Sequence, residues 1–251
     1  MLSGYYLLLL GLLYLPIAIL FLFSINANTA ISFPLRGFTL EWYEQVFNQP
    51  ALLRAAWNSI QVAVASSTVA AVLGTMIALL LARFEFRGKR ALASLAVLPL
   101  IVPYVVLAVA LLILFRAIEV QLSLVTIGAA HVVVALPYVT LIVLARVVGF
   151  DRALEDAAMD LGASYATTLR LVVLPVVAPA IVAAWLVAFT VSVDEVALAL
   201  FLAGRDPTFP VYLAGQIRFT GSLPVLIAAA VLLMVVSIGM VLVAERIRKL
   251  R

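Results

Sequence analysis

Two adjacent acids, Asp194 and Glu195, lie in the otherwise apolar segment FTVSVDEVALALF, where a carboxylate could attract a cation. An isolated carboxylate inside a membrane-spanning helix costs at least about 2.5 kcal/mol, so it should face a cavity or a partner. Adjacent helical residues point about 100° apart, and only one of the two acids can therefore face a cavity squarely. We choose Asp194 for that position, because Thr190 continues its polar line one helical turn earlier.

The two acids allow two interpretations, and the sequence leaves both open. Either they attract a cation on a translocation path, or they form an ion pair or hydrogen bond that holds helices together, including helices of a second subunit. Tyr104 and Tyr138, each next to a proline, are candidates for lining such a path. His131 has no second ligand near it in the sequence and is expected to be a hydrogen-bonded packing residue. The predicted translocation residues are thus Tyr104, Tyr138, Thr190, Asp194 and Glu195.

A second concentration of acids occurs in the segment EDAAMDLGAS, near the middle of the chain. Asp151 can cap a short helix, and Glu155 and Asp156 fall in its first turns, where the helix dipole favours negative charge. One side of this helix carries an apolar stripe at helical spacing, formed by Leu154, Ala157, Ala158 and Leu161. The other side carries charges four residues apart, namely Arg152, Asp156 and Asp160.

The residues after this helix predict a sharp turn and a second helix. Gly162 permits the turn, Ser164 can cap the second helix, and Pro175 lies where that helix enters the next apolar run. Small residues let another protein approach closely, and acids orient it through charge complementarity. The segment is therefore predicted to be a docking surface, made of Leu154, Glu155, Asp156, Ala157, Ala158, Asp160, Leu161, Gly162, Ala163 and Ser164.

The composition places these segments in a membrane protein, because 67% of the 251 residues are hydrophobic and 11% are charged. Runs of roughly 20 apolar residues, the length of a membrane-crossing helix, occur at 5–25, 56–82, 92–115, 122–148, 172–202 and 223–244. Backbone groups inside lipid need internal partners, so these runs must be helices. We predict an all-α integral membrane protein, with a single domain over residues 1–251 and the docking segment in a cytoplasmic loop at 149–172.

The basic residues predict the orientation of this six-helix arrangement. Eleven of the sixteen Lys and Arg residues fall in the connections after the second and fourth runs and in the C-terminal tail, all on one side. Loops rich in Lys and Arg stay in the cytoplasm, so both termini are predicted to be cytoplasmic. The net charge of +4 is thus a topology signal, and nucleic acid is not expected as a partner.

Several classes of function are disfavoured by what the sequence lacks. The absence of cysteine excludes disulfides, thiolate catalysis and cysteine metal sites. No grouping of Ser, His and Asp or of metal ligands predicts an enzyme or a bound metal. The segment RGKRA lacks the first glycine and the hydroxyl residue of a phosphate-binding loop, so any nucleotide must be bound by another polypeptide.

The segment DAAMDLGASYATTLRLVVLP resembles the EAA loop of permease subunits in ATP-binding-cassette (ABC) importers. That loop has the pattern Glu-Ala-Ala, three residues, Gly, nine residues, a branched aliphatic residue, one residue and Leu-Pro. Its places are occupied here by Asp156, Ala157, Ala158, Gly162, Val172, Leu174 and Pro175. Asp replaces Glu and Val replaces Ile, while the spacing is kept. The resemblance extends over most of the chain, from LEWYEQVFNQPALLRAAWNSI to the last apolar run.

The resemblance implies a fold, a location and a set of partners. The fold is that of a type I importer permease (MetI-like), with six transmembrane helices in the prokaryotic plasma (inner) membrane and lipid around them. The partners are a second, homologous permease subunit, two cytoplasmic ATPases and an external substrate-binding protein. The EAA helix is expected to lie in a cleft of an ATPase, which binds ATP and Mg²⁺, while this chain holds no cofactor.

Two segments, FTVSVDEVALALF and FPVYLAGQIRFTGSLPVLIAA, are similar to the permease branch that imports spermidine and putrescine. Carboxylates and aromatic rings are suitable transient partners for such organic cations. Related branches that import iron, opines or phosphonates remain alternatives. A rival from another class is a secondary transporter, driven by an ion gradient through Asp194 and Glu195, which would need neither an ATPase nor a docking helix.

Overall fold

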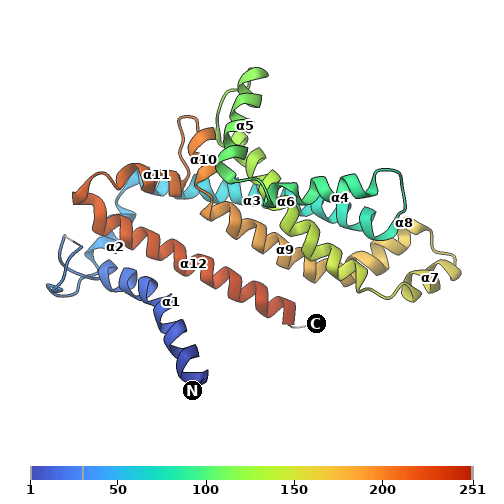
Figure 1. Cartoon of the computed structure of the whole chain (residues 1–251), viewed down its shortest axis with the longest axis horizontal. Coiled ribbons are helices and arrows are strands. Elements are labelled where there is room, and N and C mark those ends of the chain that lie inside the picture. The colour runs from blue at the N-terminus through green and yellow to red at the C-terminus, as the bar shows by residue number, and fades with distance from the viewer. Residues whose placement is uncertain (1, 30, 250–251) are drawn as a thin grey trace.

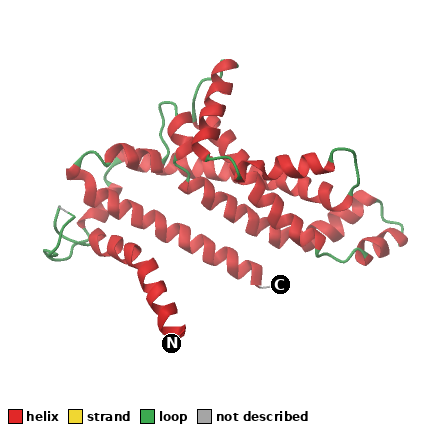
Figure 2. Cartoon of the chain, viewed as in Figure 1, coloured by secondary structure: helices red, strands yellow, loops and turns green. Residues whose placement is uncertain are grey.

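The computed structural model describes residues 2–29 and 31–249, and this part of the chain consists of helices and loops without a β-strand (Figures 1 and 2). The all-α class is therefore confirmed. The α-helices are α1 (Leu2–Ser24), α2 (Glu41–Phe47), α3 (Pro50–Arg83), α4 (Lys89–Val97), α5 (Tyr104–Ala117), α6 (Leu124–Val148), α7 (Ala153–Asp160), α8 (Tyr165–Thr168), α9 (Leu174–Asp194), α10 (Ala197–Leu202), α11 (Phe209–Gln216) and α12 (Leu223–Lys249). Short 3-10 segments η1 (Leu98–Leu100) and η3 (Thr220–Ser222) and a π segment η2 (Leu169–Val173) complete the order.

The centre of the molecule is the packing of α3 against α6 and α9. The side of α3 that faces these helices carries small buried residues at helical spacing, including Ser67, Ala70, Gly74 and Ala78. A Cβ atom at Gly74 would lie 2.6 Å from Cγ1 of Val139 on α6, so only glycine allows this approach of the two helices. Small side chains are the usual means of close helix packing in membranes, where the hydrophobic effect does not drive association.

Five helical stretches in the described residues are long and apolar enough to cross a membrane, and the bent pair of α4 and α5 would make a sixth. The five begin with Tyr5–Ser24 and continue with Pro50–Arg83, Leu124–Val148, Tyr165–Asp194 and Leu223–Val243. Long apolar side chains of α1 are exposed over most of its length, as at Leu8 and Leu12. Such a surface suits a lipid environment, in which apolar side chains need no cover.

The third apolar run is broken rather than straight. The segment Lys89–Leu100 and the helix Tyr104–Ala117 meet at an angle of 109°, and α5 projects from the rest of the molecule (Figure 1). The apolar run at 92–115 therefore forms two helical segments joined by a bend, not one straight helix. Pro103 accounts for the break, because it lacks a backbone N–H and itself has extended geometry (φ −56°, ψ 132°) directly before α5.

The fifth apolar run is also divided, so the single helix expected over 172–202 is wrong. α8 and η2 lead into α9 without an interruption, and Pro175 comes just after the π segment η2, where the regular hydrogen-bond pattern of an α-helix is already interrupted. α9 ends at Asp194, Glu195 has extended geometry (φ −75°, ψ 121°), and α10 begins at Ala197. The break thus falls at the two acids of this run.

Candidate functional site

All five predicted translocation residues line one pocket of about 380 Å³. Its walls come from the start of α5, the middle of α6 and the end of α9, together with the break that follows α9. The hydroxyl oxygens of Tyr104 and Tyr138 lie 3.5 Å apart, and both side chains are half-buried. The hydroxyl of Thr190 donates to the backbone carbonyl of Leu186 at 3.0 Å, which satisfies its donor within α9. The bend at Pro103 therefore brings the tyrosine of α5 to the acids of α9.

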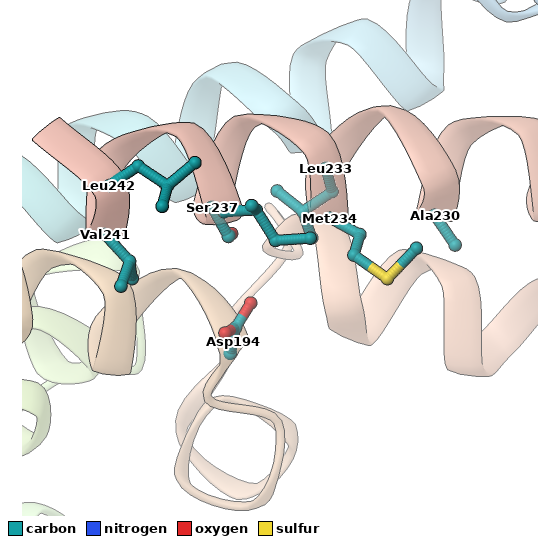
Figure 3. A pocket seen from close by; sticks show the side chains of 8 residues that line it. Asp194, Ala230, Leu233, Met234, Ser237, Val241 and Leu242 are labelled. Atoms are coloured by element: carbon teal, nitrogen blue, oxygen red, sulfur yellow. The ribbon is translucent and has the colours of Figure 1, made fainter. Parts of the chain in front are cut away.

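Asp194 is the exposed acid of the pair and borders two pockets. Besides the pocket shared with the tyrosines, it lines a pocket of about 450 Å³ whose other wall is α12. Figure 3 shows its carboxylate directed toward the α12 residues Leu233, Met234 and Ser237. Asp194 is also the last residue of α9, where the helix dipole places partial negative charge. The carboxylate and the helix end together make a negative site that favours a cation.

Glu195 is buried and its carboxylate is engaged within the chain. Oε1 accepts from the backbone N–H of Ala197 at 3.0 Å, and Oε2 accepts from those of Leu198 and Ala199 at 2.8 and 3.2 Å. These N–H groups belong to the first turn of α10 and would otherwise have no partner. The structure therefore places Glu195 in the wall of the pocket as a helix cap, and it leaves Asp194 as the acid that is open to the pocket.

His131 lies behind Glu195 in a buried polar network. Its Nδ1 is 2.7 Å from Oγ of Ser192, which is 3.1 Å from Oγ of Ser66 on α3. Its Nε2 is 3.6 Å from Oε2 of Glu195. The expectation of a hydrogen-bonded packing histidine is confirmed, but its partners were not foreseen because they lie 61 or more residues away in the sequence. Among the described residues, no three His, Asp or Glu side chains form a metal site.

The docking segment has the predicted helix-turn-helix geometry. α7 covers Ala153–Asp160, Gly162 has a φ of +88°, and Ser164 caps α8 by accepting from the backbone N–H of Thr167 at 3.3 Å. The apolar stripe is exposed at both of its ends, where Leu154 is 53% and Leu161 is 89% exposed. Asp156, Ala157 and Asp160 are exposed as well, while Ala158 and Ala163 are half-buried. An apolar stripe left uncovered on a polar segment is typical of a surface that a partner covers.

Glu155 is the exception in this segment, because it is buried. It forms an ion pair with Arg83, the last residue of α3, whose guanidinium lies 5.7 Å from the ring centroid of Phe150. Glu155 therefore contacts its own chain and does not share the exposed face of Asp156. Nothing in the sequence around Arg83 distinguishes it from the other basic residues that follow the second apolar run, so this pairing was not predictable.

Comparison with known sequences shows the family to which this chain belongs. The family described as "Binding-protein-dependent transport system inner membrane component" matches residues 70–249. The spermidine/putrescine transport system permease protein PotC of Haemophilus influenzae is 36% identical, over 94% of this chain and 92% of that protein. The putrescine transport system permease protein PotI of Escherichia coli K12 is 34% identical, over 82% of this chain and 76% of that protein.

Solved structures with the same fold are also ABC transporters. The crystal structure of a bacterial alginate ABC transporter in complex with its periplasmic protein matches with a TM-score of 0.76, at 15% identity over 99% of this chain and 92% of that chain. The MetNI methionine ABC transporter in an inward-facing conformation matches with a TM-score of 0.68, at 18% identity over 80% and 96% of the two chains. The type I permease fold is therefore confirmed, and an ABC permease is favoured over a gradient-driven carrier. The chain belongs to the family of binding-protein-dependent inner-membrane components, as a multi-pass transport subunit of an ABC importer whose ATP is hydrolysed by a separate ATPase.

Proposed function

We propose that the chain is one of two permease subunits of a polyamine importer, and that spermidine or putrescine passes the pocket at Asp194. The observation that carries this proposal is the arrangement around that acid. Asp194 is exposed to a pocket lined by Tyr104 and Tyr138, and it sits at the negative end of α9. PotC and PotI, which share about a third of their residues with this chain, are named for spermidine and putrescine transport.

The chemistry of this pocket suits an organic cation. A protonated amine gains charge-assisted hydrogen bonds from a carboxylate, and it is attracted to the faces of aromatic rings. A single accessible carboxylate binds a cation only weakly, which suits a path that the substrate must also leave. Glu195 contributes by its position, because its cap on α10 fixes the backbone next to Asp194.

We further propose that α7 is the coupling helix and lies in a groove on a cytoplasmic ATPase. Its exposed face offers apolar and small residues for close approach, and Asp156 and Asp160 offer charge for orientation. The contact surface extends through the turn and the start of α8, so that it comprises Leu154, Asp156, Ala157, Ala158, Asp160, Leu161, Gly162, Ala163 and Ser164. Glu155 takes part by holding the helix in place.

This assignment places α7 and both termini in the cytoplasm, in agreement with the excess of Lys and Arg on that side. The complete importer then contains this chain, a second homologous permease, two ATPases that bind ATP and Mg²⁺, and an external binding protein. The net positive charge of the chain then faces anionic lipid at the membrane surface, and no nucleic-acid partner is proposed.

The test is uptake of labelled spermidine into proteoliposomes that contain the complete complex. We expect uptake that requires both ATP at the α7 side and the binding protein on the other side. Competition with putrescine, iron, an opine and a phosphonate separates the possible substrates. Uptake of one of the last three, without spermidine uptake, would overturn the polyamine assignment but keep the importer. Uptake by this chain alone, driven by an ion gradient, would overturn both.

A further inference from the structure

A buried ion pair joins the C-terminal end of α3 to α7. Arg83 and Glu155 pair through Nη2 and Oε1, and the two side chains are 8% and 9% exposed. The Arg83 guanidinium also faces the ring of Phe150, at 5.7 Å from its centroid. Phe150 belongs to the same buried cluster as Val147 and Val173, at the ends of α6 and η2. The pair is thus enclosed by the core and is not a surface contact.

Two further contacts connect the same end of α3, residues 82–84, to the docking segment. Nη2 of Arg152 donates to the backbone carbonyl of Ala82 at 3.0 Å. The ring of Phe84 meets that of Tyr165, in the first turn of α8, edge to face with centroids 5.8 Å apart. A hydrogen bond, an ion pair and a ring contact therefore converge on three consecutive residues. We call residues 82–84 the α3 terminus.

The α3 terminus is an attachment for α7 that the chain order does not provide. α7 packs against α8 and η2, which follow it directly and lead into α9. The contact from Arg152 instead reaches across 70 residues of sequence to the end of α3. A displacement of α7 can therefore be transmitted to the bundle along two routes. One runs through α8 and η2 to α9, and the other runs through Glu155 and Arg152 to α3.

α3 connects this attachment to the polar network behind the pocket. Seventeen residues separate Arg83 from Ser66, which corresponds to about 25 Å along a helix at 1.5 Å per residue. Ser66 lies 3.1 Å from Ser192, whose hydroxyl contacts His131, and His131 lies beside Glu195. The helix that is held to α7 at its C-terminal end therefore contacts, at its middle, the polar network that lies behind Glu195.

We propose that Arg83 is a positioning residue for transport: with Glu155 it fixes α7 to the α3 terminus, so that displacement of α7 moves α3 together with α9. This inference rests on the proposed role of α7 as the coupling helix. Buried charges are stable only when paired, so separating α7 from the α3 terminus would leave both Arg83 and Glu155 without a counter-charge. Without the pair, a movement of the ATPase displaces α7 but no longer displaces α3 to the same extent.

The experiment compares Arg83→Gln with the wild type in the complete importer, reconstituted in proteoliposomes with spermidine as the probe. The measured quantity is the number of spermidine molecules imported per ATP hydrolysed. Arg83→Gln is expected to lower this ratio by about threefold or more while ATP hydrolysis continues. Arg87→Gln is the matched control, because Arg87 is an exposed arginine four residues away, and it should leave the ratio unchanged.

A second readout follows α7 and α3 directly and does not depend on the substrate. The chain has no cysteine, so spin labels can be attached to cysteines introduced at Leu80 on α3 and Met159 on α7, which are 38% and 41% exposed. In the wild-type complex the distance between the labels should stay the same with and without ATP. In Arg83→Gln the distribution should broaden, and it should shift when ATP binds.

The outcomes separate this proposal from the proposed function. A wild-type complex that imports no spermidine counts against the polyamine assignment, while the label distances still decide the role of Arg83. Unchanged ratio and unchanged distances in Arg83→Gln would overturn the proposal. If Arg83→Gln prevents assembly, the double variant Arg83→Gln/Glu155→Gln, which leaves no unpaired charge, is measured in its place. An assembled double variant with a lowered ratio supports the proposal, whereas normal coupling or failure to assemble overturns it, because Arg83 would then serve folding alone.

Discussion

The chain contains two pairs of adjacent acids, Glu155 with Asp156 and Asp194 with Glu195. The two members of each pair differ in burial, and the difference is the same in both pairs. In each pair the glutamate is buried and the aspartate is exposed. The buried member differs in its partner, which is the Arg83 guanidinium for Glu155 and the backbone N–H groups of α10 for Glu195. Two neighbouring carboxylates can thus separate into an anchor and a free charge, since consecutive positions point in different directions.

The difference between the anchors has a physical consequence. Glu155 depends on a single side chain from a helix that is remote in sequence, so its contact holds two elements together. Glu195 depends on the backbone that immediately follows it, so its contact shapes the chain locally and would survive changes in many side chains. The attachment of α7 is accordingly sensitive to one substitution at Arg83, and the cap of α10 has no such remote side chain to lose.

The largest effect is expected from Glu155→Gln, which leaves Arg83 buried without a charged partner. Loss of one member of a buried pair costs about 3 kcal/mol or more. The free energy of unfolding of the purified subunit in detergent, from denaturant titration of tryptophan fluorescence, should fall by this amount. The exposed Glu85 provides the matched control, as Glu85→Gln breaks only a surface pair with Lys89. An equal effect of both variants would contradict the burial of Glu155.

A slightly smaller loss is expected from Glu195→Ala, which removes the acceptor for the first turn of α10. Loss of a helix cap and of the partners of buried N–H groups costs roughly 2 kcal/mol. The same unfolding titration measures it, and Glu195→Gln, which keeps one carbonyl acceptor, should recover about half of the loss. If Glu195→Ala instead unfolded like the wild type and lost only transport, Glu195 would be a substrate contact.

Asp194→Asn should leave unfolding unchanged and impair transport. Spermidine uptake at subsaturating concentration is expected to fall by roughly tenfold, which corresponds to about 1.4 kcal/mol. Asp206→Asn, at an exposed loop acid beyond α10, is the control for a change of charge alone. Unaltered uptake in Asp194→Asn would assign both acids of this pair to structure and end the parallel with the first pair.

The smallest effect is expected from Asp156→Asn, since an exposed charge at the rim of an interface contributes little. Binding of the ATPase to the permease should weaken by about 0.5 kcal/mol, with the difference vanishing at high salt. Surface-immobilised permease in nanodiscs and soluble ATPase provide the measurement, and Glu44→Gln at the exposed surface of α2 is the control. A weakening that persists at high salt would mean that Asp156 is buried by the partner.

The parts of the fold that could be predicted are those encoded by neighbouring residues. The docking segment followed from helical spacing and from Gly162 and Ser164, whose turn and cap need no tertiary information. Tyr104, Tyr138 and Asp194 were each predicted to line a translocation path, and the structure brings them to one pocket. The angle of the bend at Pro103 was beyond prediction, because a proline marks a break without setting its size.

Which acid of each pair is buried could not be predicted, because burial depends on contacts between residues that are distant in the sequence. Arg83 is 72 residues before Glu155, and nothing in its neighbourhood distinguishes it from the other basic residues. Glu195 was placed on a continuous helix, where its carboxylate could not have reached the N–H groups that it caps. Glu195 can cap α10 only because the helix breaks at this residue, and the break is stabilised by that cap. Only the structure shows both features.

The absence of a side chain at Gly74 limits how the molecule can change shape. Interlocked backbones cannot slide or rotate past one another without collision, so α3 and α6 form a rigid frame. Changes of shape must then use the points at which helices are interrupted, the corner between α4 and α5 and the discontinuity between α9 and α10. Both points border the same pocket, so the frame can move as one body with α7 while the lining of the pocket rearranges.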